Sequence, residues 1–173
     1  MKIIAVIGSK KSGKTTTVEA IVKGLTARGH RVATAKHISE KRFSLDTAGK
    51  DTWRHAKAGA NPVVSVARGE LGIIRKIDTT KFDLREITQY CRNNVDFIII
   101  EGFRSLMKNA PKLPKILSIK AYSEAVETLK QFKSIIALTG PAASTATKLG
   151  IPVVDILEEP EKLVGIIEKK SGI

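Results

Sequence analysis

The sequence predicts an α/β protein in three layers, with a largely parallel sheet between two layers of helices. Two apolar runs, KIIAVIG at residues 2–8 and VDFIII at residues 95–100, have the continuous hydrophobicity of strands that are buried on both faces. Between such runs lie segments with helical spacing, the first of which places Val18, Ile21 and Leu25 on one face. Strand and helix patterns that alternate in this way are typical of a parallel sheet covered by helices.

The remaining elements continue the alternation, with one interruption. Further strands are expected at residues 31–35, 115–119, 134–138 and 152–156. Further helices are expected at residues 50–59, 83–91, 123–131 and 144–149, and a last one begins at Pro160. The interruption is the segment 61–77, which reads as two strands joined by a turn near residues 68–72 and predicts an inserted β-hairpin.

Length and composition predict one domain that spans residues 1–173. The chain is 42% hydrophobic, and single domains commonly run to roughly 100–200 residues. No apolar stretch approaches the roughly 20 residues that cross a bilayer, and the N-terminus has no pattern of a cleaved signal, so we expect a cytoplasmic protein without a membrane partner. The single cysteine, Cys91, excludes an internal disulfide and a zinc site built from several cysteines.

The charge indicates an anionic partner but does not identify it. There are 30 Lys and Arg residues against 17 Asp and Glu residues, a formal net charge of +13. A nucleotide, a phosphorylated cofactor, nucleic acid or an acidic protein would each suit this charge. Basic residues are spread along the chain and aromatic residues make up only 5% of it, which argues against nucleic acid. A lysine-rich surface of the kind found in thermophile proteins would also explain the charge.

The segment GSKKSGKTT, residues 8–16, predicts a phosphate-binding loop. Gly8, Gly13, Lys14 and Thr15 fit the pattern G-x-x-x-x-G-K-[ST], with a strand before it and a helix after it. Glycines let backbone N–H groups surround a phosphate, the lysine adds a charge at the β- and γ-phosphates, and the threonine hydroxyl suits Mg²⁺. The expected nucleotide contacts are Gly8, Ser9, Lys10, Lys11, Ser12, Gly13, Lys14, Thr15 and Thr16.

A carboxylate is expected to hold Mg²⁺ together with Thr15. Glu101 closes the apolar strand at residues 95–100, where nucleotide-binding proteins of this kind place such a group, and Asp46 is a second candidate. Glu101 also fits a plain surface carboxylate at a strand end. Gly102 would allow the backbone to approach the nucleotide, and Arg104 would contact a phosphate.

The segment KHISEKRFSLDTAGKDTWRHAKAGA, residues 36–60, narrows the choice of family. Together with the phosphate-binding loop and EGFR at residues 101–104, it resembles the MobB family of molybdopterin-guanine dinucleotide biosynthesis adaptor proteins. The family pattern is met by Lys36, His37, Phe43, Asp46, Gly49, Lys50, Asp51, Thr52, Arg54, Ala58, Gly59 and Ala60. A second histidine that often follows the first in the family is absent here.

The resemblance implies a GTP-binding protein with weak GTPase activity that uses Mg²⁺. It also implies that the protein binds molybdopterin, forms a homodimer and assists a MobA-type nucleotidyltransferase in attaching GMP. Lys36, His37, Lys50 and Arg54 would then belong to the nucleotide or cofactor site. Without the resemblance, the same residues fit a charged loop and a solvated helix face, and a lone histidine such as His37 is more often structural.

Preference for guanine over adenine rests on the resemblance alone. GTPases often carry an N-K-x-D box near the penultimate strand, but residues 137–144 read ALTGPAAS and contain no carboxylate. The base would be read by the main chain near residues 139–141, by another loop, or only loosely. The competing functional hypothesis is a small-molecule kinase or other NTPase, with His37 or Asp46 as a base. We also expect the homodimer to form partly through the apolar hairpin at residues 62–77.

Overall fold

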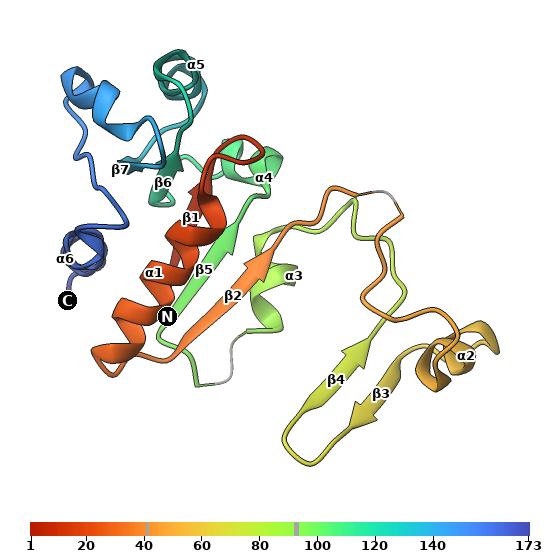
Figure 1. Cartoon of the computed structure of the whole chain (residues 1–173). Coiled ribbons are helices and arrows are strands. Elements are labelled where there is room, and N and C mark those ends of the chain that lie inside the picture. The colour runs from red at the N-terminus through yellow and green to blue at the C-terminus, as the bar shows by residue number, and fades with distance from the viewer. Residues whose placement is uncertain (41, 92–93) are drawn as a thin grey trace. The chain divides into compact units, whose positions relative to one another are not determined.

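The chain forms two compact units in the computed structural model, which describes residues 1–40, 42–91 and 94–173. The larger unit comprises residues 1–37 and 83–173, and the smaller unit comprises residues 38–82. Each unit is defined by itself, and their relative placement is not determined (Figure 1). Whether residues 1–173 fold as one domain therefore stays a prediction.

The larger unit is built on a parallel sheet of five strands in the order β2-β5-β1-β6-β7. The strands are β1 (Lys2–Ile7), β2 (Val32–Lys36), β5 (Phe97–Glu101), β6 (Lys115–Ser118) and β7 (Ile135–Thr139). Each neighbouring pair is parallel, so all five carboxyl ends lie at one edge of the sheet. Ligands of open α/β sheets bind at this edge.

Helices cover both faces of this sheet. They are α1 (Lys14–Ala27), α3 (Leu84–Gln89), α4 (Arg104–Lys108), α5 (Tyr122–Gln131), the 3₁₀-helix η1 (Ala143–Leu149) and α6 (Pro160–Ser171). Side chains of α1 and α6 pack on one face, and side chains of α4, α5 and η1 pack on the other. These layers confirm the predicted three-layer P-loop NTPase fold with a largely parallel sheet. None of the described helices is long and apolar enough to span a bilayer.

The helix that follows the phosphate-binding loop is held by its apolar stripe. Val18, Ile21 and Leu25 are buried against the sheet, as their spacing predicts. Gly24 lies against α6, where an added Cβ would stand 2.4 Å from a methyl carbon of Val164. The missing side chain lets the two helices approach closely near the carboxyl end of α1.

The smaller unit contains α2 (Asp51–Lys57), β3 (Val63–Val66) and β4 (Leu71–Ile74). The two strands form an antiparallel hairpin, in agreement with the prediction for residues 61–77. The Asn61 side chain closes its open end, because its Nδ2 donates to the Lys76 carbonyl and its Oδ1 accepts from the Lys76 amide, each over 2.9 Å.

Two predictions near the carboxyl terminus gave the wrong type of secondary structure, and one helix was not predicted. Residues 152–156 form no strand; they contribute one isolated bridge, Val153 to Leu138 of β7. The helix expected at residues 144–149 is the 3₁₀-helix η1. Helix α4 went unrecognised because its five residues are too few to show a helical period.

Candidate functional site

The chain between β1 and α1 forms a loop with free backbone amides. Gly8 has φ 153° and Gly13 has φ 93°, both in the region that favours glycine. Among the described residues, the amide groups of residues 10–13 have no hydrogen-bond acceptor. These donors lie at the amino end of α1, where a helix offers further free N–H groups and the positive end of its dipole. The loop therefore fits a phosphate group.

Close packing against the sheet edge fixes the shape of this loop. A Cβ added at Gly8 would lie 2.2 Å from the carbonyl oxygen of Ser118, at the end of β6. A Cβ added at Gly140, just after β7, would lie 2.6 Å from the carbonyl oxygen of Ser12. The Ser118 hydroxyl donates to the same Ser12 carbonyl. Side chains at Gly8 or Gly140 would push the loop off the sheet.

Lys14 places its ammonium group over the loop. Its Nζ donates a hydrogen bond to the carbonyl oxygen of Ser9. Burial lowers the pKa of Lys14 below the ordinary lysine value, and the nearby carboxylates of Glu101 and Glu124 act in the opposite direction. The side chain is thus held where it can pair with a phosphate oxygen as a point charge.

Thr15, Glu101 and Lys36 meet beside the loop. The Thr15 hydroxyl donates to Glu101 Oε1 over 3.2 Å. Lys36 Nζ lies 3.1 Å from the same oxygen and donates to Thr15 Oγ1 over 3.3 Å. Lys36 and Glu101 come together because they are register partners at the ends of the parallel strands β2 and β5.

This cluster fits a magnesium ion. Hydroxyl and carboxylate oxygens are the ligands that Mg²⁺ prefers, usually together with water and substrate phosphates. The Glu101 residue is only 8% exposed, and a buried carboxylate requires a positive partner. The Lys36 ammonium supplies that positive charge between Glu101 and Thr15, so it stands in for a cation at this position. No group of three or more His, Cys, Asp or Glu side chains suited to a metal occurs in the described part of the chain.

His37 and Gly102 lie next to this cluster and pack together. The His37 amide donates to the Glu101 carbonyl over 2.9 Å, and its ring packs on Phe103 with centroids 5.1 Å apart. Gly102 has φ 87°, and a Cβ there would lie 3.2 Å from the Cβ of His37. The contact between the two residues is structural, and their expected roles at the nucleotide stay predictions.

Arg104 is engaged with α5. Its guanidinium donates to the Thr128 hydroxyl over 3.3 Å and lies 4.9 Å from the centre of the Phe132 ring. The phosphate contact predicted for Arg104 is untested, but in this structure the side chain packs on a neighbouring helix.

Asp46, Lys50 and Arg54 belong to the smaller unit, whose placement relative to the loop is not determined. Asp46 Oδ1 accepts from the Thr52 hydroxyl over 2.8 Å, and its Oδ2 is buried without a hydrogen-bond partner in the described residues. Lys50 precedes the first residue of α2. Arg54 lies 3.8 Å from the exposed Asp51, one turn earlier on α2. The roles predicted for these three residues stay predictions.

Glu124 is a site residue that the sequence did not reveal. It lies in the first turn of α5, and its Oε1 accepts from the amide of Ser9 in the loop over 2.9 Å. Burial would raise the pKa of Glu124, but hydrogen bonds from Ser9 and Lys120 outweigh it and lower the pKa. Its place in the chain could have indicated this role, because α5 follows β6, and the carboxyl end of β6 lies beside the loop.

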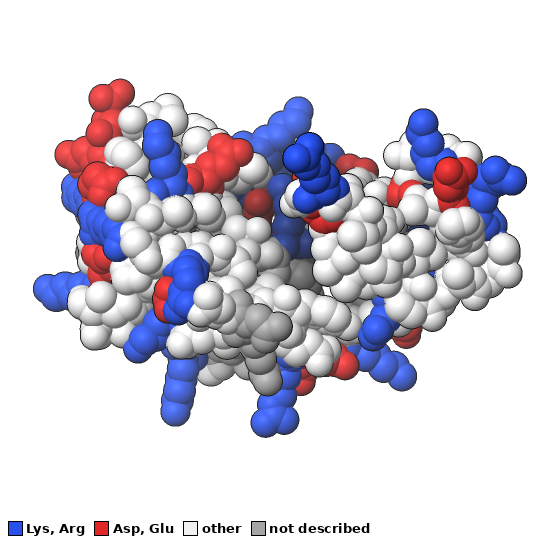
Figure 2. Space-filling view, turned by 90° about the horizontal axis from the view of Figure 1, so that it is seen from below, with Lys and Arg blue, Asp and Glu red and all other residues white. Residues whose placement is uncertain are grey.

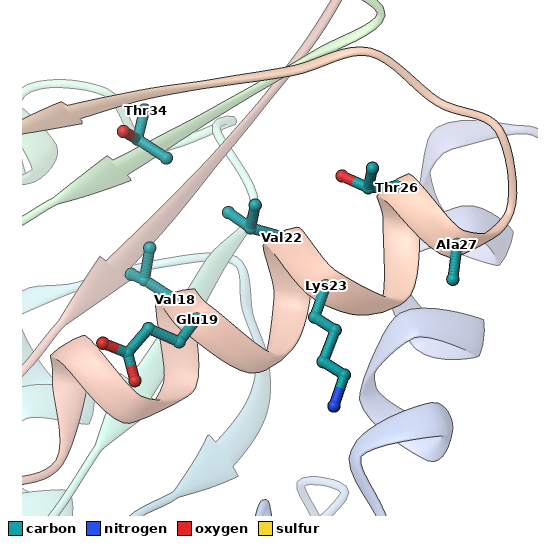
Figure 3. Close-up of a pocket in the computed structure, with 7 residues that line it drawn as sticks. All are labelled: Val18, Glu19, Val22, Lys23, Thr26, Ala27 and Thr34. Carbon is teal, nitrogen blue, oxygen red and sulfur yellow. The ribbon is translucent and has the colours of Figure 1, made fainter.

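Two hollows open on the surface of the larger unit. One, of about 620 Å³, runs along the outer side of α1 toward β2 and is lined by Val18, Glu19, Val22, Lys23, Thr26, Ala27 and Thr34 (Figure 3). The other, of about 400 Å³, adjoins the loop and is lined by Gly13, Thr16, Gly140, Pro141, Ala143, Ser144, Val153, Asp155, Ile156 and Leu157. Only the second includes loop residues, so it is the pocket relevant to a nucleotide.

Lysine and arginine side chains are spread over the face seen in Figure 2, with acidic side chains between them. This distribution agrees with the scatter of basic residues along the sequence.

Comparisons with known families and proteins identify the family of the chain. A family model described as MobB, molybdopterin guanine dinucleotide synthesis protein B, matches residues 3–140. A Methanocaldococcus jannaschii protein named for molybdopterin-guanine dinucleotide biosynthesis is 36% identical over 121 residues, which are 69% of this chain and 48% of that protein. A Haemophilus influenzae adapter protein of the same name is 34% identical over 66% of this chain and 61% of its own length. The chain thus spans about half to three fifths of these two relatives.

Solved structures of MobB proteins are similar to this chain over nearly its whole length. The crystal structure of Bacillus subtilis MobB has a TM-score of 0.73 and 27% sequence identity, covering 98% of both chains. A structure described as molybdopterin-guanine biosynthesis protein B has a TM-score of 0.70 and 26% identity, covering 96% of this chain and 98% of that one.

Proposed function

Because the chain belongs to the MobB family, we propose that it is a GTP- and Mg²⁺-dependent adaptor in the biosynthesis of molybdopterin guanine dinucleotide. The curated relatives carry adapter-protein names for this process. The observation that carries the proposal is the loop of residues 8–16 with Thr15, Glu101 and Lys36 beside it, because it offers donors for phosphates and oxygen ligands for a divalent cation.

Each group has a task in this proposal. The free amides of the loop bind the phosphates, and Lys14 moves from the Ser9 carbonyl to a phosphate oxygen. Thr15 and Glu101 hold Mg²⁺, which when bound would neutralise part of the phosphate charge. Lys36, which contacts both Glu101 and Thr15, would be available to pair with a phosphate of the nucleotide or of the pterin when a metal ion supplies the positive charge there. Lys50, Arg54 and Asp46 would join from the smaller unit.

The proposal includes a slow GTPase, molybdopterin as a second ligand, a homodimer and a MobA-type nucleotidyltransferase as partner. The test is calorimetry of the folded chain with GTP and Mg²⁺, and separately with molybdopterin. Binding of both, together with faster GMP attachment by the nucleotidyltransferase when the chain is added, is the expected result. If neither GTP nor molybdopterin binds to the folded chain, the proposal is wrong. Phosphate transfer by the chain alone at the ~1–100 s⁻¹ typical of kinases would instead favour the kinase alternative.

Lys14→Ala provides the sharpest single variant for this test. It removes one charged hydrogen bond to the phosphates while the sheet is untouched, so GTP affinity should fall about 10- to 100-fold with the fold intact. Lys23→Ala is the matched control, since it removes a lysine from an exposed position on the same helix. Equal affinity of the Lys14 variant and the parent would show that the loop does not hold a triphosphate.

A further inference from the structure

We infer that the 400 Å³ pocket beside the loop holds the base of the nucleotide and that Asp155 makes it selective for guanine. This inference rests on the proposed nucleotide binding and adds the residue that reads the base. Thr16, directly after Lys14 and Thr15, lines the pocket together with Gly13. A nucleotide whose outer phosphates lie at Lys14 would therefore bring its base end toward this pocket. The volume suits a purine, since small-molecule sites are about 300–1,000 Å³.

The fold brings Asp155 to the loop through residues that pair with β7. The amide of Leu138 donates to the Pro152 carbonyl over 2.8 Å, and the Val154 amide donates to the Leu138 carbonyl over 3.0 Å. This parallel pairing carries the chain in the direction of β7, so Asp155 emerges at the same sheet edge as Gly140. The carboxylate that is absent from residues 137–144 is thus supplied by a later segment.

The Asp155 side chain is fixed and still has an oxygen to offer. Its Oδ1 accepts from the Leu157 amide over 3.0 Å, a local turn that sets the orientation of the carboxylate. No described residue donates to Oδ2, and Asp155 is exposed to the pocket opening. Leu157, 76% exposed, and Pro141 present apolar surface beside it, which suits the flat faces of a purine.

The chemistry of this pocket distinguishes guanine from adenine. Guanine carries two neighbouring donors, the ring N1–H and the exocyclic amino group, and both can donate to one carboxylate. Adenine has an acceptor nitrogen in place of N1–H, which a carboxylate repels. Hydrogen bonds to a charged group are stronger than those between neutral groups, so one carboxylate is enough for a preference of about tenfold or more.

The test measures the binding of GTP, inosine triphosphate and ATP to the parent chain with Mg²⁺, and the binding of xanthosine triphosphate to the parent and to an Asp155 variant. The expected order of affinity is GTP, then inosine triphosphate, which lacks the exocyclic amino group, then ATP. Asp155→Asn keeps the acceptor for Leu157 and removes the charge, so GTP affinity should fall about tenfold or more. Xanthosine triphosphate has a carbonyl where guanine has the amino group, and the new amide can donate to it, so this nucleotide should gain affinity. Glu158→Gln, a neighbouring exposed carboxylate outside the pocket lining, should change nothing.

Equal binding of GTP and ATP by the parent would overturn the inference and leave the proposed nucleotide site standing. Unchanged GTP affinity in the folded Asp155 variant would also overturn the inference about the base and leave the nucleotide site standing. If the parent binds no triphosphate, the proposed function and the inference both fail. The measurements on the parent decide the matter even if the variant does not fold.

Discussion

The two units of the chain differ in how far they bury their apolar residues. The larger unit buries aliphatic side chains on both faces of its sheet, so that Ile98, Ile99 and Ile100 of β5 are all fully buried. The smaller unit leaves one face of its hairpin open, where Val64, Val66, Leu71 and Ile73 are 54–80% exposed. In the described part of residues 38–82, Val63 alone is a buried hydrophobic residue. A sheet covered by helices makes its own core, whereas a two-stranded hairpin does not.

The exposed face follows from strand geometry. Val64 pairs with Ile73, and Val66 pairs with Leu71, so the four side chains lie on one face of the hairpin. Val63 and Ile74 form a pair on the opposite face, and Ile74 is half-buried. Exposed apolar patches of this kind mark interaction sites in soluble proteins. We therefore expect the smaller unit to gain its stability from a partner surface.

Deleting the same side chain in each unit should give the largest contrast. Ile99→Ala removes a side chain that is 0% exposed and should lower the free energy of unfolding by about 2–5 kcal/mol, because it leaves a cavity in the core. Ile73→Ala removes one that is 58% exposed and should cost less than about 0.5 kcal/mol in the monomer. Urea unfolding at low protein concentration measures both. Similar losses would mean that the hairpin face is covered within the monomer.

The expected homodimer gives the second contrast. Light scattering of the parent should give a mass about twice 18.8 kDa, and Ile73→Lys should return it to the monomer mass by placing a charge in the apolar face. The neighbouring Ile74 is unsuitable for this test, because it lies on the opposite face with Val63. Thr79→Lys adds the same charge to the smaller unit outside this face and should leave the dimer intact. A dimer that persists in Ile73→Lys would place the interface elsewhere.

The smallest expected effect is a difference in Mg²⁺-dependent GTP binding between variants of the two candidate magnesium ligands, Glu101 and Asp46. Glu101→Gln removes a charge that contacts Thr15 and should weaken Mg²⁺-dependent GTP binding about tenfold, with less effect in EDTA. Asp46→Asn should weaken it less, because Asp46 bonds to Thr52 within the smaller unit. Titrations of Mg²⁺ at fixed GTP compare the two variants. A stronger effect of Asp46→Asn would show that Asp46, rather than Glu101, is the carboxylate that holds the metal.

Most of the larger unit could be predicted because its signals are local. Continuous apolar runs predicted β1 and β5, and the stripe through Val18 and Leu25 predicted α1. The strand expected at residues 152–156 failed for a different reason. Its apolar residues serve a single bridge to β7 and the core beside α6, and burial alone does not make a strand.

The phosphate-binding loop and the pairing of Thr15 with Glu101 could also be predicted, since each is tied to a motif or a strand end. Glu124 and Asp155 could not. Both lie in ordinary sequence, and they reach the loop region only because β6 and β7 end at the same sheet edge as β1.

The sequence by itself determined the strand–loop–helix that carries Gly8 to Thr16, because glycine conformation, helix start and apolar period are properties of neighbouring residues. It also determined that residues 61–77 form a hairpin with two apolar arms. Only the tertiary structure decided that Glu124 and Asp155 join Glu101 near the loop. Strand order places Glu101 beside Lys36 and brings Glu124 and Asp155 to the same edge, and strand order depends on packing between segments that are distant in the chain.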